Sequence, residues 1–269
     1  MARKAPKRLS GWHRNKPDPR DTKMMVRASS SRPKAYSNRA ICSKVEDQGG
    51  VGSCVGNATV ALMESLLIKE INAIKAAGKK PPTFVELSRL FVYYWARKIG
   101  GYPVTEDTGC QIRDALKALV RYGVCTESLH VYGDTPDFWS AKPNAAAVKD
   151  ATKHHALAYA CLGAGGPPSV GALETVLAGG NLVAFGFSVP EGFESIPASG
   201  LMPPITKGTR YEGGHAVAAI GYNSANRLVE VRNSWGTKWG DKGHFWMPYE
   251  SMFNAGICDD FQVIYKEDL

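Results

Sequence analysis

The sequence has no run of about eighteen apolar residues, which is the length that a membrane-spanning helix needs. Its start, MARKAPKRLSGWHRNKPDPRD, is basic, but no apolar region follows it, and a secretory signal peptide has such a region. The sequence therefore predicts no membrane span. It also predicts a protein that stays in the cytoplasm or is delivered by a route other than the Sec pathway.

Cysteine and histidine are scarce, with six residues of each, and neither forms a metal-binding pattern. His154 and His155 are adjacent, whereas two metal ligands on one helix face lie three or four residues apart. The glycine-rich run at 163–166 lacks the Lys and Ser or Thr of a phosphate-binding loop. Asp259 and Asp260, near the last strand, are expected to be surface charges. We therefore expect no metal and no cofactor.

Acidic residues are rare at the N-terminal end of the chain. Residues 1–40 hold twelve Lys or Arg and only two Asp, so this segment carries a charge of +10. Because the net charge of the chain is +8, residues 41–269 carry about −2. A basic segment of this kind can bind phosphates. No nucleic-acid-binding fold or regular aromatic spacing accompanies it, so we favour a solvated extension or a segment packed on its own domain. We expect a basic N-terminal extension at 1–40 and one domain at 41–269.

The hydrophobic pattern predicts helices first and strands later. A buried helix is expected from Ser53, a plausible N-cap, to Gly78, where Gly and Pro follow. The other ranges are helices near 83–98, 109–122 and 169–178, and strands at 181–189, 215–222, 227–233, 243–247 and 260–266. A helical first half and a stranded second half indicate an α+β fold with two lobes.

Cys54 follows a glycine-rich turn and opens the first helix, with Gln48 six residues upstream. A helix N-terminus carries unpaired N–H groups and a partial positive charge, which stabilise a thiolate. Far downstream, His215 and Asn233 offer a base and an amide that can orient it, and Trp235 can shield their hydrogen bond from water. These residues together indicate nucleophilic catalysis by a cysteine.

The segments that contain Gln48 and Cys54, His215, and Asn233 resemble those of the papain (C1) family of cysteine peptidases in residues and in order. The stretch NSWGTKWGDKG at 233–243 is very similar to that family's asparagine segment. The resemblance implies that Cys54 is the nucleophile, His215 the base, Asn233 its orienting partner and Gln48 the oxyanion donor. It covers about residues 41–266. It further implies a helical left lobe and an antiparallel, β-barrel-like right lobe, with the active-site cleft between them.

The expected activity is that of a cysteine endopeptidase acting on a peptide or protein substrate through a thioester intermediate. Ser53 and Gly214 are expected beside the nucleophile and the base. Gly213, where an apolar pocket wall is usual, and Phe185 on the opposite side are expected to shape a substrate pocket. The glycines that usually bind the substrate backbone are replaced by Gln111, Ile112 and Arg113, so subsite geometry does not carry over.

Secreted members of the family place a disulfide cysteine three residues before the nucleophile, where this chain has Val51. Cys110 and Cys258 resemble disulfide cysteines of the family, but the cysteines that would pair with them are missing from this sequence. The secreted disulfide framework is therefore expected to be absent, which favours a reducing compartment and a member of the type found in bacteria or bacterial viruses.

Two other functions stay open at this point. One is a related Cys/His acyl-transfer or ubiquitin-directed effector, whose orienting residue is more often Asp. The other is a catalytically silent binding protein of the same fold. A last expectation concerns residues 1–40, which we expect to fold back across the cleft or the lobe beside it and to limit access to Cys54 as an inhibitory leader. Pro17 and Pro19 are expected to resist cleavage there.

Overall fold

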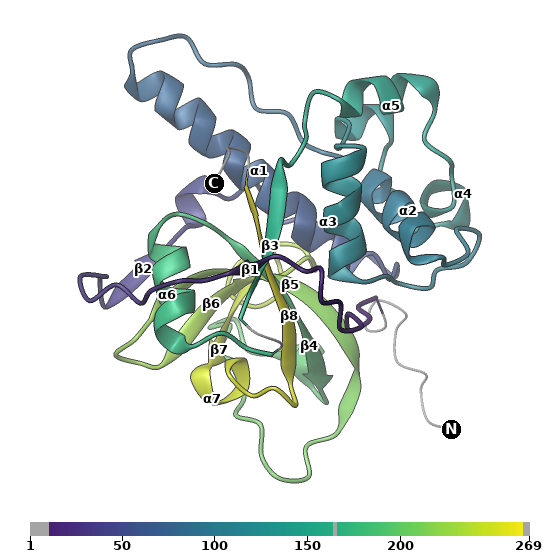
Figure 1. Ribbon diagram of the computed structural model, residues 1–269. Helices are drawn as coiled ribbons and strands as arrows, with labels where there is room; N and C mark the ends of the chain where they lie inside the picture. Colours follow the sequence, from purple (N-terminus) through teal and green to yellow (C-terminus); the bar gives the residue numbers. More distant parts are fainter. Residues whose placement is uncertain (1–10, 164–165, 266–269) are drawn as a thin grey trace.

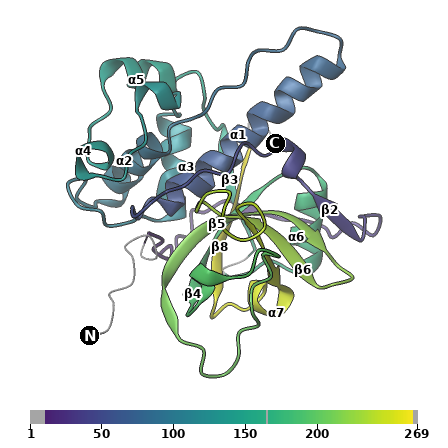
Figure 2. The same cartoon turned by 180° about the vertical axis from the view of Figure 1, so that it is seen from behind.

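A computed structural model describes residues 11–163 and 166–265. Helices gather on one side of the molecule and strands on the other, and both views show this division (Figures 1 and 2). The main helices on the helical side are α1 (Cys54–Ala76), α2 (Arg89–Gly100) and α3 (Ile112–Arg121), with the short α4 (Pro136–Trp139) and α5 (Ala145–Ala151). Short 3₁₀ turns within these described ranges lie at Arg39–Ile41, Glu127–Leu129 and Phe193–Ser195.

The strands of the described residues form one sheet in the order β1-β3-β8-β4-β5-β6-β7, and β2 pairs with β5 beside this path. All pairs are antiparallel except β1 with β3. Helices α6 (Val170–Ala178) and α7 (Tyr249–Met252) accompany the sheet. The strands are β1 (Lys23–Met24), β2 (Ala35–Ser37), β3 (Ala158–Leu162), β4 (Val183–Pro190), β5 (Tyr211–Asn223), β6 (Leu228–Arg232), β7 (His244–Pro248) and β8 (Cys258–Tyr265).

These elements confirm the predicted α+β fold of a helical part and an antiparallel sheet. The three long helices and the strands β4 to β8 lie where the sequence predicts them. Three strands were not predicted: β1 and β2 have two and three residues, and β3 precedes a glycine-rich turn. Strands β1 and β2 carry too few residues to show a period of two, which explains why the pattern misses these two.

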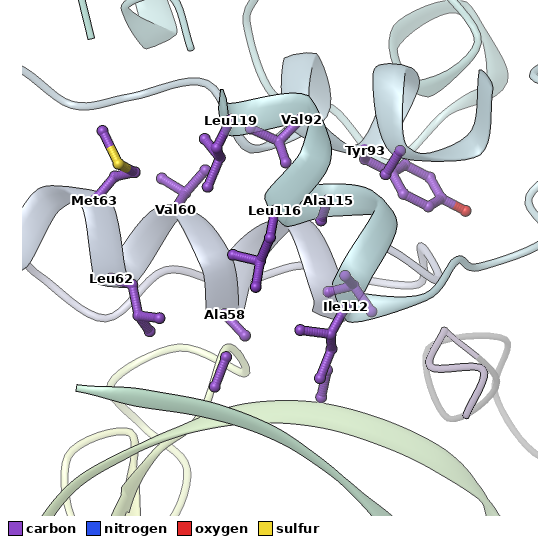
Figure 3. Packing of buried hydrophobic residues seen from close by; sticks show 14 of the residues in the cluster. Ala58, Val60, Leu62, Met63, Val92, Tyr93, Ile112, Ala115, Leu116 and Leu119 are labelled. Carbon is purple, nitrogen blue, oxygen red and sulfur yellow. The ribbon is translucent and has the colours of Figure 1, made fainter. Parts of the chain in front are cut away.

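The first half of helix α1 lies between the sheet and the other helices, so its residues 54–65 are buried. Figure 3 shows that its side chains point both ways: Ala58 and Leu62 point toward the sheet, and Val60 and Met63 toward the other helices. This explains an apolar run without a clear polar face. Ser53 occupies the N-cap position, but its side chain makes no capping hydrogen bond.

The sheet separates two apolar cores, because alternate residues of each strand point to opposite faces. Ala184 of β4 and Ala218 of β5 pack with the helices, whereas Phe185 and Val217 pack on the other face with α6. The ring of Phe185 stacks on Phe261 at 5.1 Å between centroids. Phe185 is thus a core residue, and the expected pocket wall at this position is not found.

Residues 22–40 are joined to the sheet at two places, through β1 and β2. Arginines of the basic segment form ion pairs with carboxylates of the body: Arg14 with Asp259 at 3.2 Å, and Arg32 with Glu174. These contacts agree with a segment packed on its own domain. Residues 1–10 of the expected extension lie outside the described residues. Among the described residues, no helix is long and apolar enough to cross a membrane.

Candidate active site

Cys54 is the first residue of α1 and is completely buried. The glycine-rich turn at 48–53 leads into it, as the sequence predicts. Across from it, the backbone N–H of Ala216 in β5 donates to the sulfur of Cys54 at 3.3 Å. Ala216 directly follows His215, so this contact brings the helix that carries the cysteine against the strand that carries the histidine.

His215 and Asn233 lie in contact in the buried interior, with His215 Nε2 2.7 Å from Asn233 Oδ1. Because a carboxamide oxygen can only accept, the imidazole donates through Nε2 and its tautomer is fixed. Asn233 Oδ1 also accepts from the backbone N–H of Ser234 at 2.8 Å. Trp235 covers the imidazole, with ring centroids 4.8 Å apart and an angle of 31° between the planes. The amide therefore orients the ring beneath a largely buried indole.

Gln48 is fully buried and connects the turn before Cys54 to the segment after Asn233. Its Oε1 accepts from Ser234 Oγ at 2.6 Å, and its backbone N–H donates to the Ser234 carbonyl at 2.8 Å. One N–H of its carboxamide donates to the Val51 carbonyl at 2.7 Å. These bonds hold the carboxamide inside the turn that leads to the cysteine.

Residues 11–15, which we call the strap, run between the helical side and the sheet (Figure 1). On the helical side, the Cys110 N–H donates to the Gly11 carbonyl, and the His13 N–H donates to the Cys110 carbonyl, both at 3.0 Å. On the sheet side, the Trp12 N–H donates to the carbonyl of Gly214 at 3.3 Å. The strap thus bonds to both walls of the site.

Gly11 covers the sulfur of Cys54. A methyl group placed on its Cα would lie 2.7 Å from that sulfur, so only glycine fits at this position. Pro17 and Pro19, expected to cross the cleft, lie beyond the strap with exposed side chains. Among the described residues of the leader, Gly11–Asn15 occupy the site, and this part contains no proline.

Trp12 fills a pocket on the sheet side of the site. Its indole lies against Gly186 and Gly214, where an added Cβ would meet indole atoms at 1.9 and 2.9 Å. The indole N–H donates to Asp260 Oδ2 at 2.9 Å, and the backbone N–H of Asn15 donates to the same oxygen at 2.8 Å. Asp260, expected at the surface, is instead a partly buried acceptor for the strap.

Burial under the strap changes the titration of both groups that it covers. Burial raises the pKa of the Cys54 thiol to about 12, although the N–H groups of Ala216 and Val55 act in the opposite direction. Burial also raises the pKa of Asp260 to about 6. In the strap-covered state the sulfur of Cys54 is therefore a neutral thiol at pH 7.

The structure brings together Gln48, Cys54, His215 and Asn233, which are far apart in the sequence. Of the expected supporting residues, Gly214 contacts the strap, and Gly213 lies beside it in β5 opposite Val189. Ser53 precedes the nucleophile, and its hydroxyl lies 2.6 Å from the Tyr132 hydroxyl.

No pattern in the sequence indicated the roles of Trp12 and Asp260. The strap has no periodic pattern, and two adjacent aspartates are typical of a surface. Among the residues that the structure describes, no group of three or more Cys, His, Asp or Glu side chains is placed to hold a metal ion.

The fold and this site define a cysteine protease, and the chain belongs to the papain family. The sequence model described as papain family cysteine protease matches residues 101–263, a range that includes His215 and Asn233. The six cysteines are all free thiols, as expected because the partner cysteines of the family's disulfides are missing. The protein is thus a papain-like hydrolase.

Individual relatives agree with this assignment. An uncharacterized peptidase C1-like protein of Acanthamoeba polyphaga mimivirus is 33% identical over 226 residues, which are 82% of this chain and 69% of the relative. Cysteine proteinase 3 of Entamoeba histolytica is 25% identical over 248 residues, 90% of this chain and 71% of that protein. Among solved structures, xylellain, a cysteine protease from Xylella fastidiosa, superposes with a TM-score of 0.86 at 33% identity, and each chain is covered over 100% of its length.

Proposed function

We propose that the protein is an endopeptidase that cleaves peptide bonds in protein substrates through Cys54, His215, Asn233 and Gln48. The observation that carries the proposal is the hydrogen bond of 2.7 Å between His215 and Asn233, next to the contact between Ala216 and the Cys54 sulfur. A nucleophile, a base and a group that orients the base are the parts that acyl transfer by a thiol requires.

The reaction proceeds in two halves. The thiolate of Cys54 attacks the carbonyl carbon of the scissile bond, and the imidazolium of His215 gives its Nδ1 proton to the leaving amine as the C–N bond breaks. This leaves a thioester on Cys54. Water then loses a proton to His215 and attacks the thioester, which releases the carboxylic acid product and the free enzyme. No oxidant, metal or cofactor is consumed in either half.

Gln48 and the backbone N–H of Cys54 are the proposed donors to the oxyanion of the tetrahedral intermediate. Gln48 lies in the turn that precedes α1 and Cys54 is the first residue of the helix, so the negative oxygen forms next to the positive end of a helix. The bonds from Gln48 to Ser234 and Val51 hold the carboxamide in one orientation before substrate arrives. A donor fixed in advance costs little reorganisation during the reaction.

We further propose that the strap keeps the protease inactive. Three observations support this: Gly11 lies against the Cys54 sulfur, the strap bonds to both walls, and burial holds the thiol neutral. Because the strap is tethered, weak intrinsic affinity is enough, since its effective concentration is on the order of millimolar. Activity therefore requires displacement or cleavage of the strap.

The test compares a full-length chain carrying Trp12→Ala, which weakens the strap, with the same chain carrying Cys54→Ala as well, using a peptide library and mass spectrometry to map the cleavage products. We expect Cys54→Ala to remove all cleavage while the circular dichroism spectrum and the melting temperature stay close to native. Cys161→Ser serves as the matched control, because Cys161 is a half-buried thiol in β3 outside the site. Cleavage by Cys54→Ala at the native rate would overturn the proposal.

A further inference from the structure

We propose that Asp107 is a positioning residue that clamps the turn carrying Cys54, although its negative charge opposes the thiolate. The inference rests on the proposed role of Cys54 as nucleophile. Asp107 lies in the loop between α2 and α3, 53 residues after the cysteine. Neither its sequence context nor the family resemblance suggested a role for it.

The clamp is a direct hydrogen bond to the main chain two residues before Cys54. The backbone N–H of Gly52 points between the two carboxylate oxygens of Asp107, at 3.1 Å from Oδ1 and 3.0 Å from Oδ2. A charged acceptor makes such a bond stronger than a neutral one. The turn enters α1 at this point, so the position of Gly52 helps to set where the Cys54 sulfur and N–H lie.

Helix α2 holds Asp107 in place through Tyr93. The hydroxyl of Tyr93 donates to Asp107 Oδ1 at 2.6 Å and accepts from the backbone N–H of Gly109 at 2.9 Å. The ring of Tyr93 is fully buried, and Figure 3 shows its hydroxyl pointing away from the apolar side chains around it. A rigid helix side chain therefore fixes both the carboxylate and the loop that carries it.

Arg97, one turn further along α2, holds the preceding part of the same loop. Its guanidinium is buried, lies 3.9 Å from the centre of the Tyr93 ring, and donates to the carbonyls of Val104 at 3.0 Å and Glu106 at 2.7 Å. The loop just before Asp107 is thus bound to the helix through its backbone. Rigid support of this kind is what a site needs when its geometry must be reproduced closely.

A second clamp holds the other end of the turn. The hydroxyl of Tyr132 donates to the Gln48 carbonyl at 2.9 Å and lies 2.6 Å from the Ser53 hydroxyl. Asp107 and Tyr132 therefore fix the turn from two directions. Since all six cysteines are free thiols, side-chain hydrogen bonds provide this support without a disulfide.

The negative charge of Asp107 distinguishes a role in positioning the turn from electrostatic stabilisation of the thiolate. Burial is the main cause of the raised Cys54 pKa, and the negative charge of Asp107 raises it further. Of the other groups near the sulfur, the backbone N–H of Ala216 donates to it from β5, and Cys110 lies near it in the loop before α3. A carboxylate beside a thiolate nucleophile is unfavourable because both carry negative charge. The contribution of Asp107 to the geometry of the turn must therefore outweigh this repulsion.

The experiment separates geometry from charge with two substitutions in the full-length chain. Asp107→Ala removes the clamp and the charge, whereas Asp107→Asn removes the charge but keeps an acceptor for Gly52. Each is made in the native chain and with Trp12→Ala, which weakens the strap. Glu106→Ala is the matched control, because it removes an exposed carboxylate next to Asp107 whose side chain is not part of the clamp.

We expect Asp107→Ala to lower kcat about 10²-fold with little change in KM, because a shift of about 1 Å at the nucleophile has that effect. Asp107→Asn should retain most of the activity and move the midpoint of Cys54 alkylation to lower pH. Tyr93→Phe keeps the buried ring but loses the hydroxyl, and it should lower kcat in the same direction as Asp107→Ala. Glu106→Ala should leave both the rate and the alkylation midpoint unchanged.

Native kcat in Asp107→Ala, or equal losses in Asp107→Asn and Asp107→Ala, would overturn the clamp. Asp107→Asn keeps the test decisive if the alanine variant fails to fold. Failure of the proposed function is recognised separately, because peptide mapping of the alkylated protein shows whether Cys54 is labelled, and Cys54→Ala shows whether it is needed for hydrolysis.

Discussion

At the scale of single residues, Cys54 is subject to two opposing effects. Its place at the start of a 23-residue helix favours the thiolate, while complete burial under Gly11 favours the neutral thiol. Burial is the stronger effect in this state, as the raised pKa of about 12 shows. The same residue can therefore be inert when covered and reactive when uncovered, without any change in the helix that carries it.

Gln48→Ala tests the proposed oxyanion donor at this scale. We expect kcat to fall roughly 10²- to 10³-fold with little change in KM, because the donor acts on charge that develops only in the transition state. Steady-state kinetics on a short peptide measures both constants, with and without Gln48→Ala, in a chain that carries Trp12→Ala to weaken the strap. Since Gln48 also bonds to Ser234 and Val51, the melting temperature must be recorded for the variant. A rise in KM at constant kcat would assign Gln48 a binding role instead.

At the scale of elements, the strap behaves as a short built-in ligand. It adds backbone hydrogen bonds to Cys110 on one side and to Gly214 on the other, and it inserts one large side chain, Trp12, between two glycines. Main-chain bonds give such a segment affinity, and the side chain in a pocket gives it a fixed register. The arrangement makes release of the strap a local event that leaves the rest of the sheet paired.

Trp12→Ala should therefore open the site. Removing a buried Trp side chain costs about 3 kcal/mol or more, and while the open state is minor this raises its population roughly 100-fold. We expect faster alkylation of Cys54 and a higher kcat/KM on a short peptide. Lys16→Ala is the control, since that exposed side chain lies outside the strap. Equal alkylation rates in Trp12→Ala and the native chain would contradict an inhibitory strap.

The covered pocket also predicts how release depends on pH. With the strap in place the pKa of Asp260 is about 6, and in the released state we expect a value near the ordinary 3.8, because solvent then reaches the carboxylate. At a pH between these two pKa values, Asp260 binds a proton when the strap is in place and does not bind it when the strap is released. Raising the pH from about 4 to about 6 therefore favours release, and above about pH 6 the effect is complete.

Hydrogen exchange at the amides of Trp12 and His13 measures this release directly, because both amides bond to the walls of the site. After correction for the intrinsic exchange rate, protection should fall between pH 4.5 and 6.5 in the native chain. In Asp260→Asn, which cannot titrate, the protection should be flat over that range. The same slope in both chains would assign the pH dependence to another group.

At the scale of the whole molecule, the N-terminal segment has two parts with different roles. Residues 11–15 cover the site, whereas residues 22–40 add β1 and β2 to the sheet and carry Arg32, which pairs with the buried Glu174. Asn38 also donates to the carbonyl of Leu177 in α6 at 2.9 Å. The second part thus contributes to the fold itself, even though its composition resembles that of an extension.

Two truncations separate these roles. Deletion of residues 1–15 should leave a folded chain with higher kcat/KM, because it removes the strap but keeps both strands and Asp21, which pairs with the buried Arg113. Deletion of residues 1–40 should lower the melting temperature strongly, since an unpaired buried charge costs about 3–5 kcal/mol against a total stability of about 5–15 kcal/mol. Thermal unfolding followed by circular dichroism measures both. A stable, active 41–269 fragment would show that residues 22–40 are dispensable.

The sequence by itself determined the class of fold and the candidate catalytic residues, because their signals are local. A helix start after glycines, a histidine opening an apolar strand and the NSWG segment each lie within about ten residues, so short-range patterns reveal them. Tertiary structure decided the rest. The face of β4 that Phe185 occupies follows from strand register, and a shift of one residue would exchange it with Gly186. The strap, Asp260 and Asp107 act across separations that run from 43 residues, between Gly11 and Cys54, to 248 residues, between Trp12 and Asp260. Only the folded chain brings such groups into contact.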